Sequence, residues 1–133
     1  MMRYLTYDEL IALHVVLVRG KMQETYYGVR DEGLLRSALA RPQNAAHYEN
    51  ADATKQAAYL FHGLLMNHGF AQGNKRTAYL AMEWFLARNS LGALAASDEE
   101  IIAMVYAAER EKWSVERMEG WLREHIADER SAE

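Results

Sequence analysis

The sequence predicts an all-α fold, a single domain of about six helices in one bundle around a buried central helix. Apolar residues recur at helical spacing along most of the chain, and no useful stretch shows the alternating pattern of a strand. The 133 residues fit one domain and contain no internal repeat or dividing linker. A composition of 50% hydrophobic and 26% charged residues is typical of a globular chain with one core.

The chain begins with a predicted helix over about residues 6–19. Thr6 followed by Glu9 is the pattern of a capping box, and apolar residues then recur on one helical stripe. Residues 20–29 hold two glycines without clear periodicity, which predicts a loop with at most a short extended piece.

The second predicted helix is short. Asp31 has the residue type of an N-cap, and apolar residues at helical spacing continue to Leu39. Pro42, the only proline, is expected to stop this helix, because proline lacks the amide hydrogen and clashes with the preceding turn. Residues 42–51 are therefore expected to form a polar connection.

Two strongly periodic helices follow. The first is amphipathic over residues 57–65 and is expected to end near Asn67. The second begins around Asn74 and is apolar on nearly every face, with Glu83 as its only charge over residues 77–87. The second is therefore predicted to be the buried central helix.

Two further helices complete the predicted bundle. After a loop over residues 89–96, Ser97 and Glu100 form another capping box. A last helix is expected from Ser114, and the tail from Asp128 is expected to fray.

Composition restricts the classes of protein and partner. The absence of cysteine excludes a disulfide framework, a thiolate zinc site and a cysteine nucleophile. A net charge of -4 argues against wrapping of nucleic acid, which needs a clustered basic face. The N-terminus does not resemble a secretory signal, and no uncharged apolar run reaches the roughly 18 residues of a membrane span. We therefore expect a soluble, cytoplasmic protein that binds neither nucleic acid directly nor membranes.

Polar residues crowd into the segment between the two periodic helices. The segment reads His68-Gly69-Phe70-Ala71-Gln72-Gly73-Asn74-Lys75-Arg76. The start of a helix presents unpaired N–H groups and the positive end of the macrodipole, which suits a phosphate. Lys75 and Arg76 in the first turn oppose this dipole, and an external anion would resolve the conflict.

The other residues of the segment fit a site for nucleotide phosphates. Gly73 lets backbone and ligand approach closely, Asn74 is suited to cap the helix and tie the loop together, and Phe70 is expected to anchor the loop by facing inward. His68 is the natural general base, because imidazole titrates near neutral pH. The spacing does not match a P-loop, and His62 and His68 lack the i, i+4 spacing of a helical zinc pair.

The nine-residue segment resembles the active-site motif of the Fic/Doc family, H-x-F-x-[DE]-[AG]-N-[KG]-R, and fits eight of its nine positions. Lys75 followed by Thr77-Ala78 resembles the Doc branch, the death-on-curing toxins of toxin–antitoxin pairs. Residues 28–35 and 38–43 resemble the N-terminal segments of Doc-like proteins. The resemblance implies a compact Fic/Doc-like bundle over the single domain 1–133.

The resemblance also implies an activity. Doc-like toxins transfer a phosphoryl group from ATP or another nucleoside triphosphate to a hydroxyl of a target protein. In the Doc branch this target is a translation factor. Nucleotidyl (AMP) transfer by the same site is the alternative. His68 would take the proton of the hydroxyl, and Phe70 would seat the loop. The phosphates would be held by Gly73, Asn74, Lys75 and Arg76. A cognate antitoxin is implied as a partner, because the inhibitory motif [ST]-x-x-x-E-[GN] of some Fic proteins is missing.

Two positions depart from the family pattern. Gln72 stands where the family has Asp or Glu, the carboxylate that helps hold Mg²⁺, and an amide oxygen supplies a ligand without a charge. Gly69 replaces a frequent proline and is expected to loosen the loop. The sequence therefore leaves open a second interpretation, in which the fold is a catalytically degenerate binding module.

The remaining titratable residues are expected to have structural positions. His14 lies on an apolar stripe and is predicted to be a hydrogen-bonded core histidine, whereas His62 is predicted at a helix surface. Glu83 is expected either to pair with a cation or to occupy a solvated face. Residues 109–112 are assigned to solvated faces.

Overall fold

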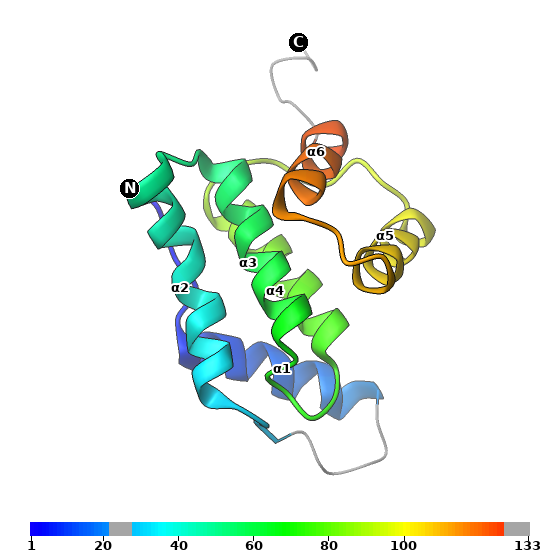
Figure 1. Cartoon of the computed structure of the whole chain (residues 1–133). Helices are drawn as coiled ribbons and strands as arrows, with labels where there is room; N and C mark the ends of the chain where they lie inside the picture. The colour runs from blue at the N-terminus through cyan, green and yellow to red at the C-terminus, as the bar shows by residue number, and fades with distance from the viewer. Residues whose placement is uncertain (22–27, 127–133) are drawn as a thin grey trace.

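The computed structural model describes residues 1–21 and 28–126. Six helices and two isolated β-bridges are the regular structure of this part of the chain, which confirms the all-α prediction. The helices are α1 (Tyr7–Lys21), α2 (Glu32–Glu49), α3 (Ala53–Asn67), α4 (Asn74–Arg88), α5 (Asp98–Arg110) and α6 (Val115–His125). Figure 1 shows α2, α3 and α4 side by side, with α1 crossing at one end of them and α5 and α6 on the side away from α2.

The buried centre of the bundle is α3, which packs against α2, α4 and α6. Its buried residues are Thr54, Gln56, Ala57, Ala58, Leu60, Phe61, Gly63, Leu64 and Leu65. The sequence had favoured the helix from Asn74 for this position, and that assignment was wrong. α4 buries only one face, because Leu80 and Trp84 are half-buried and Glu83 is exposed. The apolar residues on the other side of α4 line surface grooves instead.

α2 is longer than predicted. It continues through Pro42 to Glu49, so residues 42–51 form the second half of a helix rather than a polar connection. The buried residues of α2 are Leu35, Ala38, Pro42 and Ala45. They recur at helical spacing, and α2 packs closely on α3. Burial of this stripe outweighs the one hydrogen bond that a proline removes from a helix.

Side chains cap five of the six helix starts in the described part of the chain. At α1, the Thr6 hydroxyl accepts the Glu9 N–H at 3.2 Å and the Glu9 carboxylate accepts the Thr6 N–H at 2.9 Å. Ser97 and Glu100 make the same exchange at α5, which confirms both predicted capping boxes. The caps of α2, α3 and α6 are Asp31, Asp52 and Ser114. α4 begins after Gly73 without any side-chain cap.

The remaining expectations concern the connections. Val29 forms an isolated bridge with Phe70, the short extended piece expected near this point, whereas the rest of that predicted loop lies largely outside the described residues. The predicted tail from Asp128 lies outside them as well. None of the helices in residues 1–21 and 28–126 combines the length and the apolar character needed to cross a membrane.

Candidate functional site

The segment predicted to carry the chemistry forms the loop between α3 and α4. α3 ends at Asn67, and its C-cap is His68, whose backbone lies in the left-handed region with φ 51°. This conformation is uncommon outside glycine, although histidine adopts it more often than most residues. The carbonyl of His68 accepts a hydrogen bond of 2.8 Å from Nε of Arg30, which holds the turn, and the imidazole is left half-buried.

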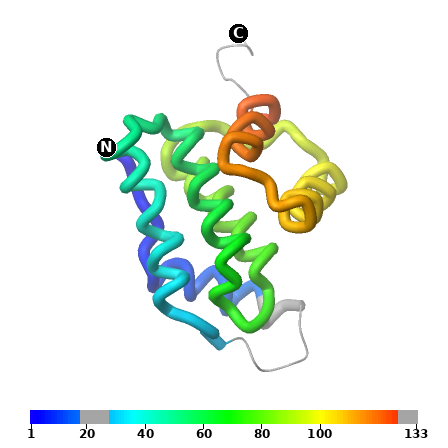
Figure 2. The backbone as a smooth tube through the Cα atoms, viewed as in Figure 1, coloured from blue at the N-terminus to red at the C-terminus, as the bar shows by residue number. Residues whose placement is uncertain are grey.

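A short segment before α2 runs beside this loop and holds it in place (Figure 2). Val29 forms an antiparallel bridge with Phe70. The N–H groups of Arg30 and Asp31 both donate to the carbonyl of Gly69, at 2.8 and 3.0 Å. These backbone contacts fix the path of the loop beside the segment before α2.

Gly69 meets a packing requirement that the sequence did not indicate. A Cβ at this position would lie 2.4 Å from Cδ2 and 2.6 Å from Cγ of Leu35. Leu35 is only 1% exposed, and its side chain has little room to move in the close-packed core. The missing side chain therefore lets α2 approach the loop closely.

Phe70 points into the core, where it is 2% exposed and lies against His14 of α1. The two rings stack with centroids 3.7 Å apart and planes inclined by 8°. Nδ1 of His14 is hydrogen-bonded to Oγ1 of Thr77 in α4 at 2.9 Å, which confirms the prediction of a hydrogen-bonded core histidine. Through these contacts the loop is tied to both α1 and α4.

Asn74 closes the loop on itself. Its Oδ1 accepts the N–H of Phe70 at 3.0 Å, and its Nδ2 donates to the carbonyl of Phe70 at 2.9 Å. The predicted tie is therefore present, but the N-cap of α4 is Gly73 and not Asn74. Because both polar atoms of the side chain are used within the loop, Asn74 offers a ligand its backbone N–H.

The first turn of α4 is open and positively charged. Gly73 has φ 76°, a conformation that favours glycine, and it supplies no side-chain cap. The N–H of Thr77 donates to the carbonyl of Gly73, whereas the N–H groups of residues 74–76 precede the first bond within the helix. Arg76 is exposed and has no acidic partner at ion-pair distance among the described residues. Free donors, a positive helix end and a cation are the components of an anion site.

Lys75 is engaged with α5, unlike Arg76. Its Nζ lies 3.2 Å from Oε1 of Glu109 and 5.1 Å from the centre of the Tyr106 ring. The Glu109 side chain is 22% exposed and that of Lys75 is 36% exposed. The assignment of Glu109 to a solvated face was therefore wrong, because this carboxylate pairs with a residue of the motif.

A cleft of about 490 Å³ opens beside the first turn of α4. Lys75 and Arg76 contribute charge to its lining, and Leu17, Ile102 and Tyr106 contribute apolar walls from α1 and α5. The cleft therefore combines cations for phosphate with apolar surface for a larger group.

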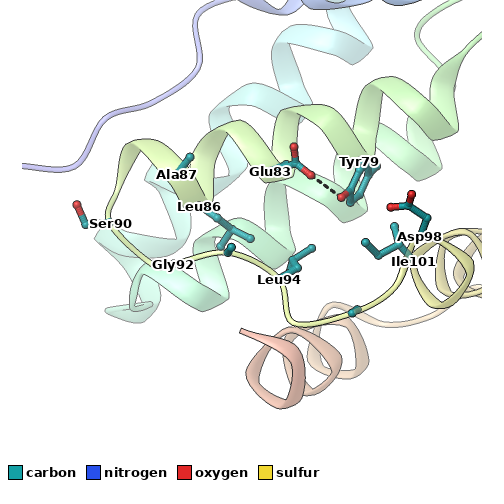
Figure 3. A pocket seen from close by; sticks show the side chains of 11 residues that line it. Tyr79, Glu83, Leu86, Ala87, Ser90, Gly92, Leu94, Asp98 and Ile101 are labelled. Carbon is teal, nitrogen blue, oxygen red and sulfur yellow. Dashed lines mark hydrogen bonds between the residues drawn. The ribbon is translucent and has the colours of Figure 1, made fainter. Parts of the chain in front are cut away.

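A second cavity of about 680 Å³ lies further along α4 (Figure 3). Tyr79 and Asp98 line both cavities, so the two adjoin at the contact between α4 and α5. The hydroxyl of Tyr79 donates a hydrogen bond to Glu83, one turn further along α4. Burial and this carboxylate raise the pKa of Tyr79, which keeps the phenol a donor. Glu83 itself is exposed, the second of the two positions expected for it.

His62, the other histidine near the motif in sequence, has a different environment. It is half-buried rather than at the surface, and its Nδ1 lies 2.9 Å from a guanidinium nitrogen of Arg41 in α2. Burial, and next the charge of Arg41, lower the pKa of His62. A neutral imidazole can accept the hydrogen bond that Arg41 donates, so this pair joins α2 to α3.

Known proteins are similar to the part of the chain that contains this loop and helix start. The sequence profile of the Fic/DOC family matches residues 4–86, which is more than half of the chain. The chain is also 34% identical over 93 residues to "Toxin Doc" of Mycolicibacterium smegmatis (strain ATCC 700084 / mc(2)155), a match that covers 68% of each protein. The chain belongs to the Fic/Doc family. Within this family it is similar to a Doc toxin, as the lysine form of its motif had suggested.

The Fic/Doc match covers α1 to α3 and nearly all of α4, and it ends before α5. The structure brings the motif residues together on one loop and one helix start, as their adjacency in sequence requires. Three residues that contact the motif from elsewhere were not identified from the sequence: Arg30, Tyr106 and Glu109. The spacing of Tyr106 and Glu109 places them on one face of α5, but nothing in the sequence identifies Lys75 as their neighbour.

The loop does not supply the carboxylate that the Fic/Doc motif offers to Mg²⁺. Gln72 occupies that position, and no acidic residue lies between His68 and Met82. Among the described residues, no group of three His, Asp or Glu side chains could hold a metal ion. A neutral amide and the absence of nearby carboxylates do not fit a resident Mg²⁺ site, because Mg²⁺ is usually bound through at least one carboxylate.

Proposed function

We propose that this chain is a Doc-like toxin that transfers the γ-phosphoryl group of a nucleoside triphosphate, such as ATP, to a hydroxyl of a target protein. One observation carries the proposal: among the described helices, α4 alone begins without a side-chain cap, and it begins with Lys75 and Arg76 a few residues after His68. Stability alone disfavours such a helix start, whereas this start favours the binding of phosphate. Membership of the Fic/Doc family and similarity to a Doc toxin support the assignment.

In the proposed reaction, the oxygen of the target hydroxyl attacks the γ-phosphorus while the imidazole of His68 takes the hydroxyl proton. The bond between the γ-phosphorus and the oxygen bridging to the β-phosphate breaks, and the nucleoside diphosphate leaves with that electron pair. Arg76, Lys75 and the N–H groups of residues 74–76 balance the charge on the phosphate oxygens. The packing of Phe70 and the loop closure by Asn74 hold these groups in place before the ligand arrives.

Transfer of the AMP moiety by the same site is the alternative reaction. It would require the α-phosphorus, rather than the γ-phosphorus, to lie beside His68. We favour phosphoryl transfer because Lys75 stands where the Fic branch has glycine, and this lysine is the form that resembles the Doc branch.

We propose two protein partners. The first is the modified target, a translation factor by analogy with Doc-like toxins, which places the activity in the cytoplasm. The second is a cognate antitoxin, for which an apolar groove of about 550 Å³ between α1 and α4 offers a docking surface. Leu13, Val16, Leu80 and Trp84 line this groove, and Val16 is 74% exposed. An amphipathic helix is the element that fits an apolar groove of this kind.

Gln72 favours a second candidate function, a Fic/Doc fold that binds its partners and transfers nothing. A neutral amide in place of a carboxylate leaves Mg²⁺ dependent on the nucleotide's own phosphates. The two candidates differ in one respect that can be measured, which is whether any part of the nucleotide reaches a protein.

The test is incubation of the protein and a bacterial lysate with ATP labelled at either the α or the γ phosphate. Label reaching a protein from the γ position alone supports phosphoryl transfer, and label from the α position indicates nucleotidyl transfer. No transfer from either, with Gln72→Asp inactive as well, favours the binding module. We expect His68→Ala to lower transfer at least about a hundredfold. His47→Ala, at an exposed position of α2, is the matched control and should have no effect. Full transfer by His68→Ala would overturn the proposed mechanism.

A further inference from the structure

The Lys75–Glu109 pair joins the motif to a part of the chain outside the family match. Nζ of Lys75 and Oε1 of Glu109 are 3.2 Å apart, and this is the only ion pair between α4 and α5 among the described residues. Neither side chain is fully solvated, with exposures of 36% and 22%. The attraction is therefore screened less than that of a pair on the open surface.

Tyr106 lies one turn before Glu109 and reinforces the same position. The Lys75 ammonium lies 5.1 Å from the centre of its ring, a distance at which a cation is attracted to an aromatic face. Two residues of α5 thus draw Lys75 toward that helix. Arg76, the next residue, has no such partner in the described part of the chain.

The position of the pair opposes the binding of phosphate in two ways. A triphosphate that takes up Lys75 must share or displace the carboxylate that now neutralises it. A carboxylate that stays in place also repels the phosphate charge at short range. Both effects act in one direction, toward weaker nucleotide binding.

We propose that Glu109 is an intramolecular competitor of the nucleotide for Lys75, so that α5 sets the affinity of the site for triphosphate. The inference rests on the proposed function, because it presumes that the start of α4 binds nucleotide phosphates. Glu109 is a positioning residue in this scheme: it acts through Lys75 and takes no part in the transfer itself. Release of Lys75 from Glu109 accompanies nucleotide binding.

The experiment measures ATP affinity by titration calorimetry in the full chain and in Glu109→Gln, which removes the charge and keeps the shape. We expect ATP to bind about fivefold more tightly to the variant, the upper range for a partly exposed ion pair. Adenosine, which carries no phosphate, should bind equally to both proteins. A role of Glu109 in packing alone would not produce this dependence on phosphate.

Glu111→Gln is the matched control, because it makes the same change in net charge just beyond α5. Glu111 pairs with Arg110 and Arg117 and not with Lys75, so its loss should leave ATP affinity unchanged. In a Lys75→Gln background, Glu109→Gln should no longer tighten binding, because the residue it competes for is gone. Thermal unfolding of each variant verifies that it is folded.

The outcomes separate this inference from the proposed function. Equal ATP affinity of wild type and Glu109→Gln would overturn the competition and leave nucleotide binding intact. Tightening that persists in the Lys75→Gln background would also overturn it, since a general charge effect would then explain the result. The inference would be supported most strongly if Glu109→Gln bound ATP and the wild type did not. If no folded variant binds ATP, the proposed function fails first and the inference fails with it.

Discussion

The first turns of α4 and α5 carry opposite charges. α5 begins with the Ser97 hydroxyl on the N–H of Glu100, and the three acidic residues of its first turn complement the helix dipole. α4 follows Gly73, an N-cap without a side chain, and its first turn has no acid and two cations, Lys75 and Arg76. The same physical chemistry acts on both helices, and the start of α5 has the features that stabilise a helix, a side-chain cap and acidic residues. The start of α4 departs from it in every respect.

The start of α4 lowers the stability of the protein, and other contacts in the fold compensate for this loss. A glycine in place of a side-chain cap lowers stability by only about a few tenths of a kcal/mol, and each cation in a first turn opposes the dipole by about 0.3–1 kcal/mol. The apolar contacts of α3 on one side of α4 and the rigid loop before it keep the open helix start in place. A feature that stability disfavours and packing preserves is the expected signature of a ligand site.

Charge reversal at Arg76 should change binding and stability in opposite directions. In Arg76→Glu, ATP affinity should fall about tenfold or more, because a charge-assisted contact with phosphate is replaced by repulsion. The free energy of unfolding should rise by about 0.5 kcal/mol, because an acid suits the first turn. Titration calorimetry measures the first quantity and urea unfolding the second.

The matched control for Arg76→Glu lies at the other end of the same helix. Arg88 is in the last turn of α4, where a cation complements the dipole. Arg88→Glu should therefore lower the unfolding free energy by a similar amount and leave ATP affinity unchanged. A loss of stability in Arg76→Glu, with unchanged ATP affinity, would make Arg76 a structural residue and end the contrast with α5.

Much of the fold was accessible from local sequence, because caps and stripes are local. Both capping boxes were predicted correctly from residues three apart, and the Asp31 cap from its residue type. Pro42 was misjudged, because its intrinsic effect on a helix is large and the compensating burial against α3 is a tertiary contact. The choice of α4 as central helix failed for a related reason. Its composition is apolar on nearly all sides, but only the assembled bundle determines which faces another helix covers.

The loop before α4 is closely packed, so the open helix start does not result from a loose connection. Gly69→Ala tests this, because its Cβ would come within 2.4 Å of the buried Leu35. We expect a loss of about 1–3 kcal/mol in unfolding free energy, the usual cost of overpacking a core. Gly120→Ala is the control: its Cβ meets nothing within 4 Å, and it lies inside α6. That change should stabilise the protein by up to about 1 kcal/mol. A neutral Gly69→Ala in urea unfolding would show that the loop is looser than its contacts indicate.

The candidate site divides into a part that the sequence determined and a part that it did not. Residues 68–76 are adjacent in sequence, so their presence on one loop and one helix start followed from helical periodicity alone. Glu109 could not be placed in the same way, because its contact with Lys75 depends on how α5 packs on α4. The packing role of Gly69 was not predicted for the same reason, since the neighbouring Leu35 lies on another helix.

The smallest expected effect is a change of stability with pH. It arises at the start of α3, which an acid caps, in contrast to the start of α4. The Asp52 carboxylate accepts the N–H of Lys55 and binds Arg123, and these contacts lower its pKa below the ordinary value of 3.8. Because its pKa is lower in the folded state, the carboxylate contributes stability above pH 3.8 and loses that contribution as the pH falls through the folded pKa. Asparagine also caps helices, so Asp52→Asn should lower stability slightly at neutral pH by removing the ion pair with Arg123. The difference between the two proteins should shrink as the pH falls below about 4, which urea unfolding at several pH values would measure. A difference that stays constant down to pH 3 would mean that the carboxylate charge at the start of α3 contributes nothing, and the contrast with the acid-free start of α4 would then rest on hydrogen bonds alone.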